Sequence, residues 1–212
     1  MKPGATEPES GLERRIHDLR AELKTQDKLS MARNTGAVYS GGLFHLEVWN
    51  RPVQISERDF IAFDVQDGTA CDVVTQAMLA YYFHTSDGTP IRGEWTAFRE
   101  LPDGQFYASA FQGYTGNKLA RTFGDKIDLF AQAAAMTNGR AQPFGDAAFA
   151  FQALPRVPVA VVGWLGDEDF PTSYSILFDD SIHHHLPTDA CAILGSMLTA
   201  KLAAIKAGGV KS

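Results

Sequence analysis

The sequence predicts an α+β domain, in which an antiparallel sheet carries about four helices. Some segments repeat apolar residues every three or four positions, as helices do, and others alternate apolar and polar residues, as strands do. Short turns connect neighbouring strand segments, which favours antiparallel pairing with helices packed on the sheet. Fourteen Phe and six Tyr give an aromatic-rich interior, which favours a sheet over a pure helical bundle.

A single domain is predicted over residues 11–206, because 212 residues suit one core and the sequence contains no repeat or second boundary. Residues 1–10, which are rich in Pro, Glu and Gly, are predicted to be a disordered tail. Residues 207–212 are predicted to be a flexible basic tail.

In the first half of the domain, the helical period predicts a long helix over residues 12–33. The strand pattern then recurs in three short segments between turn residues, at residues 43–49, 52–55 and 60–65. Thr69 is predicted to cap a second helix, with Asp72 three residues later as in a capping box.

In the second half, residues 94–111 read as a β-hairpin with its turn at Pro102-Asp103-Gly104. A third helix is predicted over residues 117–136, with a kink at Gly124. Apolar segments bounded by turn residues predict three further strands, at residues 147–154, 157–164 and 173–179. Thr188 is predicted to cap the final helix.

Composition and charge exclude several classes of protein. The net charge of −6 argues against nucleic-acid binding, which needs a basic surface. No membrane span is expected, since the longest apolar run, residues 157–165, contains a proline and is too short to cross a bilayer. The start of the chain lacks the apolar core of a signal peptide, and the two cysteines are far apart, so a cytoplasmic protein is expected.

Five segments resemble an uncharacterised prokaryotic family, the domain-of-unknown-function family 3786. The segments are GEWTAFRELPDG at 93–104, LPRVP at 154–158, WLGDEDFP at 164–171, LFD at 177–179 and HLPTD at 185–189. The resemblance implies a protein typical of anaerobes, and some members look like accessories to corrinoid or iron–sulfur metabolism. Those members carry a cysteine-rich segment before the domain. This sequence has no cysteine there, so cluster binding is not carried over.

Three consecutive histidines, His183, His184 and His185, are the most unusual local feature. On an extended loop alternate residues point the same way, so His183 and His185 are predicted to face one site. Imidazole is a common metal ligand and could bind haem iron or cobalt axially. The alternative is a surface loop whose histidines bond to backbone carbonyls.

The acidic loop 166–171 contains Asp167, Glu168 and Asp169. Carboxylate oxygens suit a hard cation, so Asp167 and Glu168, with His183 and His185, form the candidate metal set. The alternative is a solvated turn between two strands, with Gly166 and Pro171 setting its geometry.

Two arginines and two tryptophans in the family-like segments complete the candidate site. Arg99 and Arg156 could grip a carboxylate or propionate, or instead form structural ion pairs with Glu94, Glu100 or Asp146. Trp95 and Trp164 could line a pocket for a flat ligand, or instead be core aromatics.

These features favour a non-enzymatic cofactor-binding or accessory domain, with a tetrapyrrole (haem or corrinoid) as candidate ligand. The resemblance adds an anaerobic redox or methyl-transfer pathway and a protein partner. Two alternatives stay open: a non-catalytic protein-interaction subunit, and a small metal-dependent hydrolase that uses the acidic loop.

Overall fold

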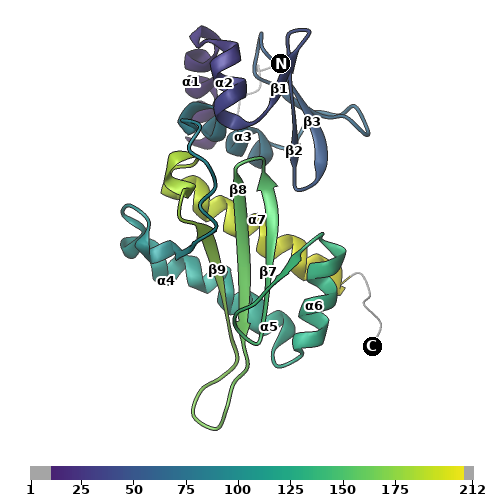
Figure 1. Ribbon diagram of the computed structural model, residues 1–212, viewed down its shortest axis with the longest axis vertical. Helices are drawn as coiled ribbons and strands as arrows, with labels where there is room; N and C mark the ends of the chain where they lie inside the picture. The colour runs from purple at the N-terminus through teal and green to yellow at the C-terminus, as the bar shows by residue number, and fades with distance from the viewer. Residues whose placement is uncertain (1–10, 208–212) are drawn as a thin grey trace, which may run out of the picture.

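The computed structural model describes residues 11–207, which form two antiparallel sheets flanked by helices (Figure 1). The α+β class is therefore confirmed, with the strands divided between two sheets. The predicted tails, residues 1–10 and 207–212, lie outside the described residues, except that Ala207 ends the last helix.

The N-terminal part is built on a four-stranded sheet with the strand order β1-β2-β3-β4. Its elements are α1 (Gly11–Thr25), α2 (Lys28–Thr35), β1 (Val38–Ser40), β2 (Leu43–Val48), β3 (Arg51–Ser56), β4 (Ala62–Asp64) and α3 (Val73–Thr85). Helix α1 packs along α3, and Leu19, Leu23 and Tyr82 are completely buried. Apolar burial of this kind is the main force that holds these two helices together.

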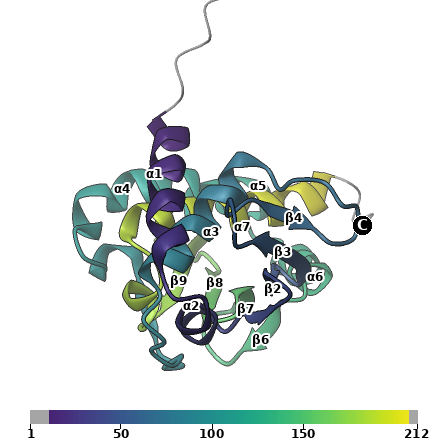
Figure 2. The same cartoon turned by 90° about the horizontal axis from the view of Figure 1, so that it is seen from above.

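The C-terminal part is built on a five-stranded sheet with the strand order β5-β9-β8-β7-β6. Its strands and 3₁₀ turns are β5 (Trp95–Ala97), η1 (Phe98–Glu100), β6 (Arg140–Gln142), β7 (Ala147–Leu154), β8 (Val157–Trp164), β9 (Ser173–Asp179) and η2 (Ile182–His184). Its helices are α4 (Gly104–Tyr114), α5 (Gly116–Phe123), α6 (Ile127–Met136) and α7 (Thr188–Ala207). Seen from above, α4, α5 and α7 lie along one side of the sheet (Figure 2).

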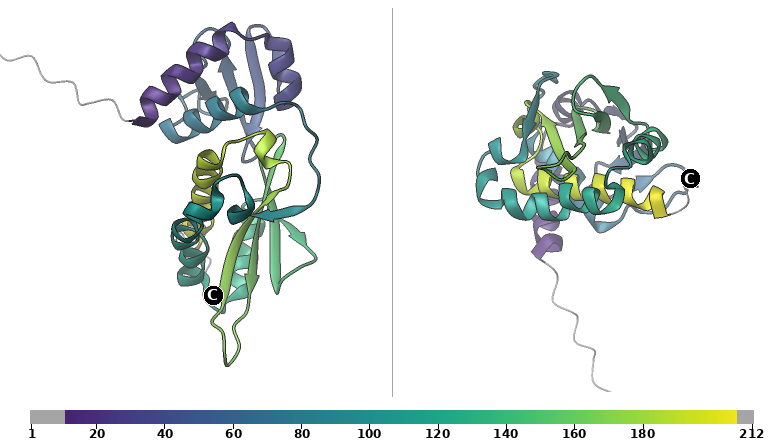
Figure 3. Two further views of the ribbon diagram at one scale, coloured as in Figure 1. Left: turned by 90° about the vertical axis from the view of Figure 1, so that its left-hand side faces the viewer. Right: turned by 90° about the horizontal axis from the view of Figure 1, so that it is seen from below.

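The side chains that face these helices are set by strand register. Phe149 pairs with Val161, and Val161 pairs with Ile176, so these three side chains lie side by side across β7, β8 and β9. Val161 and Ile176 are fully buried. Buried residues from both parts of the chain belong to one hydrophobic cluster. A single segment, residues 86–94, carries the chain from α3 to β5 along the outside (Figure 3).

Helix α7 is the long core helix of the C-terminal part. Residues Thr188–Lys206 are long and apolar enough, by length and composition, to cross a membrane. A core helix of a soluble fold passes the same test, and Leu194, Leu198 and Leu202 are completely buried against the rest of the molecule. The apolar character of α7 is therefore accounted for by core packing in this fold.

Two of the predicted helices are each divided into two. Residues 12–33 form α1 and α2, because the Asp27 carboxylate accepts a hydrogen bond from Ser30 N at 2.8 Å and starts a new helix. Residues 117–136 form α5 and α6, because Gly124 adopts a φ of 54° and ψ of −135° and ends α5. The predicted kink at Gly124 is therefore a break.

The predicted hairpin over residues 94–111 is wrong beyond β5. The Glu100 carboxylate accepts hydrogen bonds from Ala97 N at 2.9 Å and from the Thr96 hydroxyl at 3.0 Å, which holds the chain in the η1 turn. Asp103 then adopts the left-handed conformation, with φ 58°, and α4 begins at Gly104. The 102–104 turn therefore leads into a helix.

The start of α3 also differs from the prediction. Asp72, not Thr69, is the N-cap, since its carboxylate accepts a hydrogen bond from Thr75 N at 2.9 Å. Thr188, the predicted cap of α7, is instead its first residue, and its hydroxyl donates to Pro102 O at 2.7 Å. The short strands β1 and β6 were not predicted, because three residues are too few to show alternation.

Candidate functional site

His184 and His185 fasten the 86–94 segment to the C-terminal part. His185 is completely buried, its Nε2 donates to Thr89 O at 3.0 Å, and its Nδ1 lies 3.4 Å from Ser86 Oγ. His184 Nδ1 lies 2.7 Å from the Asp87 carboxylate. Both ring nitrogens of His185 are thus occupied, so His185 has none left for a metal or haem. The His185 imidazole bonds to a backbone carbonyl, as the alternative expected, whereas the His184 imidazole bonds to a side-chain carboxylate.

Asp179 binds the same segment, residues 86–94, close to its C-terminal end. Its buried carboxylate accepts hydrogen bonds from Arg92 N at 3.0 Å, Gly93 N at 2.6 Å and Ser181 N at 3.0 Å. Burial alone would raise the pKa of Asp179, but the hydrogen bonds from Ser181, Arg92 and Gly93 outweigh it, so the pKa is lowered. The next residue, Asp180, forms an ion pair with Arg92 at the surface.

His183 does not share a site with His185. The expected extended loop is the 3₁₀ turn η2, in which neighbouring side chains diverge by about 120° instead of alternating. His183 is exposed, whereas His185 points into the core. Among the described residues, the His183 imidazole makes no hydrogen bond or ion pair and only contacts the ring of His184.

The acidic loop lies at the opposite end of β9 from the histidines (Figure 1). Asp167 binds its own loop, accepting from Asp169 N at 2.9 Å and Phe170 N at 2.8 Å, and these bonds lower its pKa. Glu168 lies in the same loop, away from His183 and His185. Across residues 11–207, no three His, Cys, Asp or Glu side chains gather in a geometry that could hold a metal ion.

The predicted arginines and tryptophans are also dispersed. Arg99 is exposed on η1, and Arg156 donates from its Nη2 to Arg33 O at 3.1 Å, near the turn between β7 and β8. Trp95 pairs with Asp179 at one end of β9, while Trp164 pairs with Ser173 at the other end. Trp164 is 51% exposed, and Trp95 contacts Phe144. The two tryptophans therefore do not line a common pocket.

One pocket brings two of the family-like segments together, between η1 and α4 on one side and the start of α7 on the other. We call it the α4–α7 pocket. Its volume is about 630 Å³, and its residues are Phe98, Pro102, Asp103, Tyr107, Ala110, Tyr114, His183, Leu186, Pro187, Thr188, Asp189 and Ala192. The hydrogen bond from Thr188 to Pro102 ties the segment 185–189 to the segment 93–104. A pocket of this size and apolar lining suits a small ligand or an anchoring side chain.

The aromatic side of this pocket was missed by the sequence analysis. Tyr107 and Tyr114 line it, and with Phe111 they follow a spacing of four and three residues, which is helical. Phe111 is buried and stacks on Phe98 with ring centroids 4.0 Å apart. Tyr107 is 64% exposed and not a core aromatic. The spacing could have revealed α4 before the structure did.

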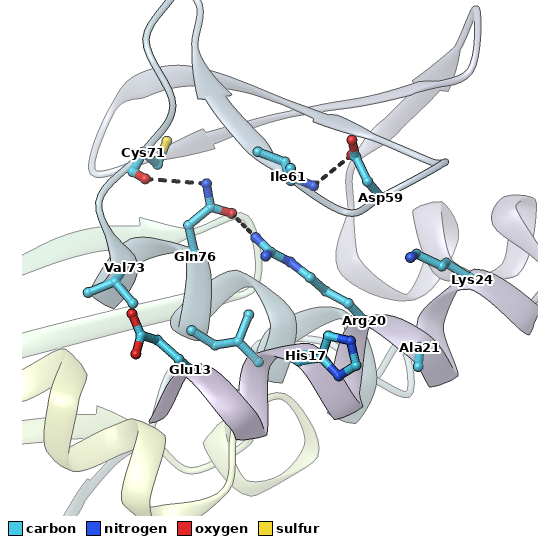
Figure 4. A pocket seen from close by; sticks show the side chains of 11 residues that line it. Glu13, His17, Arg20, Ala21, Lys24, Asp59, Ile61, Cys71, Val73 and Gln76 are labelled. Carbon is cyan, nitrogen blue, oxygen red and sulfur yellow. Dashed lines mark hydrogen bonds between the residues drawn. The ribbon is translucent and has the colours of Figure 1, made fainter. Parts of the chain in front are cut away.

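A second pocket, of about 710 Å³, lies between α1 and α3 (Figure 4). Arg20 points across it, and its guanidinium donates to Gln76 Oε1 and to Phe60 O at 3.0 Å. Gln76 in turn donates to Ala62 O at 2.9 Å and Cys71 O at 3.3 Å, and accepts from Ala62 N. These bonds hold β4 and the start of α3 in place, so Arg20 and Gln76 have a structural role.

The burial of His185 leads to a prediction for stability. Burial lowers the pKa of His185, although Thr89 and Asp87 oppose this, while Arg156 and His184 add to it. The unfolded chain therefore takes up a proton at a higher pH than the folded chain does. As pH falls below about 6.5, stability should decline by at most about 1.4 kcal/mol per pH unit from this group.

Urea unfolding at several pH values between 5 and 7 would measure this effect. His185→Gln keeps the buried polar contacts in part and should flatten the pH dependence, and His17→Gln, the same substitution at an exposed position, is the control. An equal slope in wild type and His185→Gln would contradict the prediction.

Comparison with known proteins gives a family-level match. A family model described as "Domain of unknown function (DUF3786)" matches residues 27–201. No curated protein and no solved structure matches the chain. The matched residues include every residue that lines the α4–α7 pocket, whereas the pocket beside Arg20 is partly lined by α1, outside the match.

Proposed function

This chain belongs to the DUF3786 family of domains of unknown function, and we propose that it is a protein-interaction domain that receives an apolar anchor side chain of a partner in the α4–α7 pocket. The observation that carries the proposal is the pocket itself, in which two family-like segments meet beside exposed aromatic side chains. Concave apolar pockets with aromatic walls are where partner side chains contribute most binding energy.

The aromatic surface extends past the pocket along α4. Phe106 is 73% exposed and Tyr107 64% exposed, so two consecutive large aromatic side chains of α4 are in solvent. The exposed phenol of Tyr107 can pack against an apolar side chain and still donate a hydrogen bond. Tyr107 and Tyr114, seven residues apart, lie on the same face of α4 and both line the pocket, while Phe106 lies outside its lining.

Charge at the edge of the pocket indicates the chemistry of the partner. Asp103 and Asp189 are both exposed at this edge, and the whole chain has a net charge of −6. The occupant we propose is therefore a partner segment that carries a Leu, Met or aromatic anchor flanked by Lys or Arg. Such charge complementarity guides association and weakens as salt is added.

Selection from a phage library of random peptides, using the purified chain as bait, would test this function. Enriched peptides should combine an apolar anchor with basic flanking residues. Tyr107→Ala should weaken their binding by about tenfold, or about 1.4 kcal/mol, because the anchor loses one wall of its pocket. Fluorescence polarisation with a labelled synthetic peptide would measure the affinity.

Phe170→Ala is the matched control. Phe170 is a 72% exposed aromatic residue in the acidic loop, far from the α4–α7 pocket, so its removal should leave peptide affinity unchanged. Asp103→Asn should reduce affinity at low salt and have less effect at high salt. Equal binding by wild type and Tyr107→Ala, or peptides without basic residues, would count against the proposal.

A tetrapyrrole is the second candidate for the same pocket. The free His183 imidazole at its edge supports this candidate, because imidazole can bind haem iron axially. The other residues fit less well: Arg99, Arg156, Trp95 and Trp164 lie elsewhere, and Asp103 and Asp189 would repel propionates. Absorbance titration with haem would distinguish the two. A saturable Soret shift that is lost in His183→Ala supports a tetrapyrrole, and a flat response leaves the peptide-binding function.

A further inference from the structure

A separate cleft of about 700 Å³ lies between the four-stranded sheet and the middle of α7. Trp49 lines it from the turn between β2 and β3, and Arg51 lines it from the start of β3. Thr75 lines it from α3, and Ser196 and Lys201 line it from α7. It shares no lining residue with the α4–α7 pocket. Its function can therefore be tested independently of the proposed peptide binding.

The Lys201 amine is half-buried in this cleft, where the charges of Arg51 and Asp72 act on it. Among the described residues, its Nζ makes no hydrogen bond and no ion pair, and it lies 5.8 Å from the centroid of the Trp49 ring. Other partly buried lysines are satisfied: Lys28 donates to three backbone carbonyls, and Lys206 donates to Thr122 O. No hydrogen-bond acceptor in the described part of the chain therefore holds this amine, which leaves it available to a ligand that enters the cleft.

Arg51 provides a second cationic group in the same cleft. One of its terminal nitrogens, Nη2, lies 2.7 Å from the Asp64 carboxylate and 3.8 Å from Asp67. Across the described part of the chain, its other guanidinium nitrogens make no hydrogen bond. They are therefore free to bind a carboxylate, the group that a guanidinium recognises best.

We propose that Lys201 is an amine nucleophile that forms an imine with a small aldehyde or ketone that also carries a carboxylate. The carboxylate would bind Arg51, and the apolar part of the ligand would lie against the ring of Trp49. The neutral Nζ attacks the carbonyl carbon, and the carbonyl π electrons move to oxygen to give a carbinolamine. In the carbinolamine one amine proton has moved to this oxygen. The hydroxyl then leaves as water with the second amine proton, and a neutral C=N bond remains.

The electrostatics of the cleft favour the neutral amine that this step needs. Burial lowers the pKa of Lys201, and the positive charge of Arg51 lowers it further, while Asp72 opposes the shift. The nearby thiol is less suited to attack, because burial and the carboxylates of Asp64, Asp72 and Asp67 raise the pKa of Cys71. The two shifts therefore favour the neutral, nucleophilic form of Lys201 and disfavour the thiolate, the nucleophilic form of Cys71.

Reductive trapping would test the proposal. The purified chain is incubated with glyoxylate, an aldehyde that carries a carboxylate, in the presence of sodium cyanoborohydride, and the modified lysines are located by peptide mass mapping. Lys201 should be modified faster than the exposed Lys118 and the hydrogen-bonded Lys206. Equal modification of Lys201 and Lys118 in the wild-type protein would overturn the proposal without requiring any variant.

The same experiment with propanal tests the carboxylate requirement. Arg51→Met should slow modification of Lys201 by glyoxylate about tenfold more than modification by uncharged propanal, because only glyoxylate loses about 1.4 kcal/mol of carboxylate binding, whereas both aldehydes lose the effect of the Arg51 charge on the pKa of Lys201. Equal slowing of modification by both aldehydes would mean that Arg51 does not bind the carboxylate of the ligand. Arg51→Lys, which keeps a positive charge, should give an intermediate rate with glyoxylate.

Discussion

Replacement of Asp179 by alanine is expected to lower the free energy of unfolding by about 3 kcal/mol, because it leaves the buried N–H and hydroxyl of Ser181 without an acceptor and frees the segment at Arg92 and Gly93. The backbone N–H groups of Arg92, Gly93 and Ser181 all donate to this carboxylate, and only 1% of Asp179 is exposed. Each unsatisfied donor costs about 1 to 3 kcal/mol. Urea denaturation followed by circular dichroism would measure the loss.

Asp180→Ala is the control for this variant. Asp180 is the next residue and also carries a carboxylate, but it forms only a half-exposed ion pair with Arg92. Exposed ion pairs contribute about 0 to 1 kcal/mol, so this variant should be close to wild type. Equal destabilisation by the two substitutions would mean that the connection between residues 86–94 and β9 is not held by Asp179.

Gly104→Ala is expected to destabilise the fold by about 3 kcal/mol and to abolish peptide binding in the α4–α7 pocket. A Cβ atom at Gly104 would overlap the carbonyl oxygen of Phe98 and lie 3.4 Å from Leu101 Cβ. The η1 turn cannot move away freely, because Leu101 N donates to this same carbonyl. The collision would displace Phe98 or the start of α4, both of which form the pocket.

Gly113→Ala separates this collision from a general effect of alanine in a helix. Gly113 lies in the same helix, α4, and a Cβ atom there would meet nothing within 4 Å. Alanine is favoured over glycine inside helices by about 1 kcal/mol, so Gly113→Ala should be neutral or stabilising. Thermal unfolding and peptide affinity, measured on both variants, would check the prediction. A Gly104→Ala protein as stable as Gly113→Ala would contradict it.

Local patterns were enough for the strands of the larger sheet. The predicted limits of 147–154, 157–164 and 173–179 coincide with β7, β8 and β9. These segments are long, rich in β-branched and aromatic residues, and bounded by turn residues, so short-range preferences and packing favour the same conformation. Helix α7 was predictable for the same reason, because its apolar residues repeat over many turns.

The segment 94–111 shows where local patterns mislead. Pro102-Asp103-Gly104 is a good turn sequence, but a turn can lead to a strand or a helix. The hydrogen bond from Ala97 N to the Glu100 carboxylate and the stacking of Phe98 on Phe111 decide in favour of a helix. The α4–α7 pocket therefore could not be predicted while this segment was interpreted as a hairpin.

The histidines show the same limit at the level of function. Three consecutive histidines marked the segment 183–185 as unusual in the sequence. Two of the family-like segments, 93–104 and 185–189, are the ones that meet at the pocket. Orientation depended on partners far away in the chain: Thr89 lies 96 positions before His185, and Pro102 lies 86 before Thr188. Fold class, most elements and family follow from short-range periodicity and motifs. Which side chains share a site follows from long-range hydrogen bonds and packing, because only the folded chain brings those partners together.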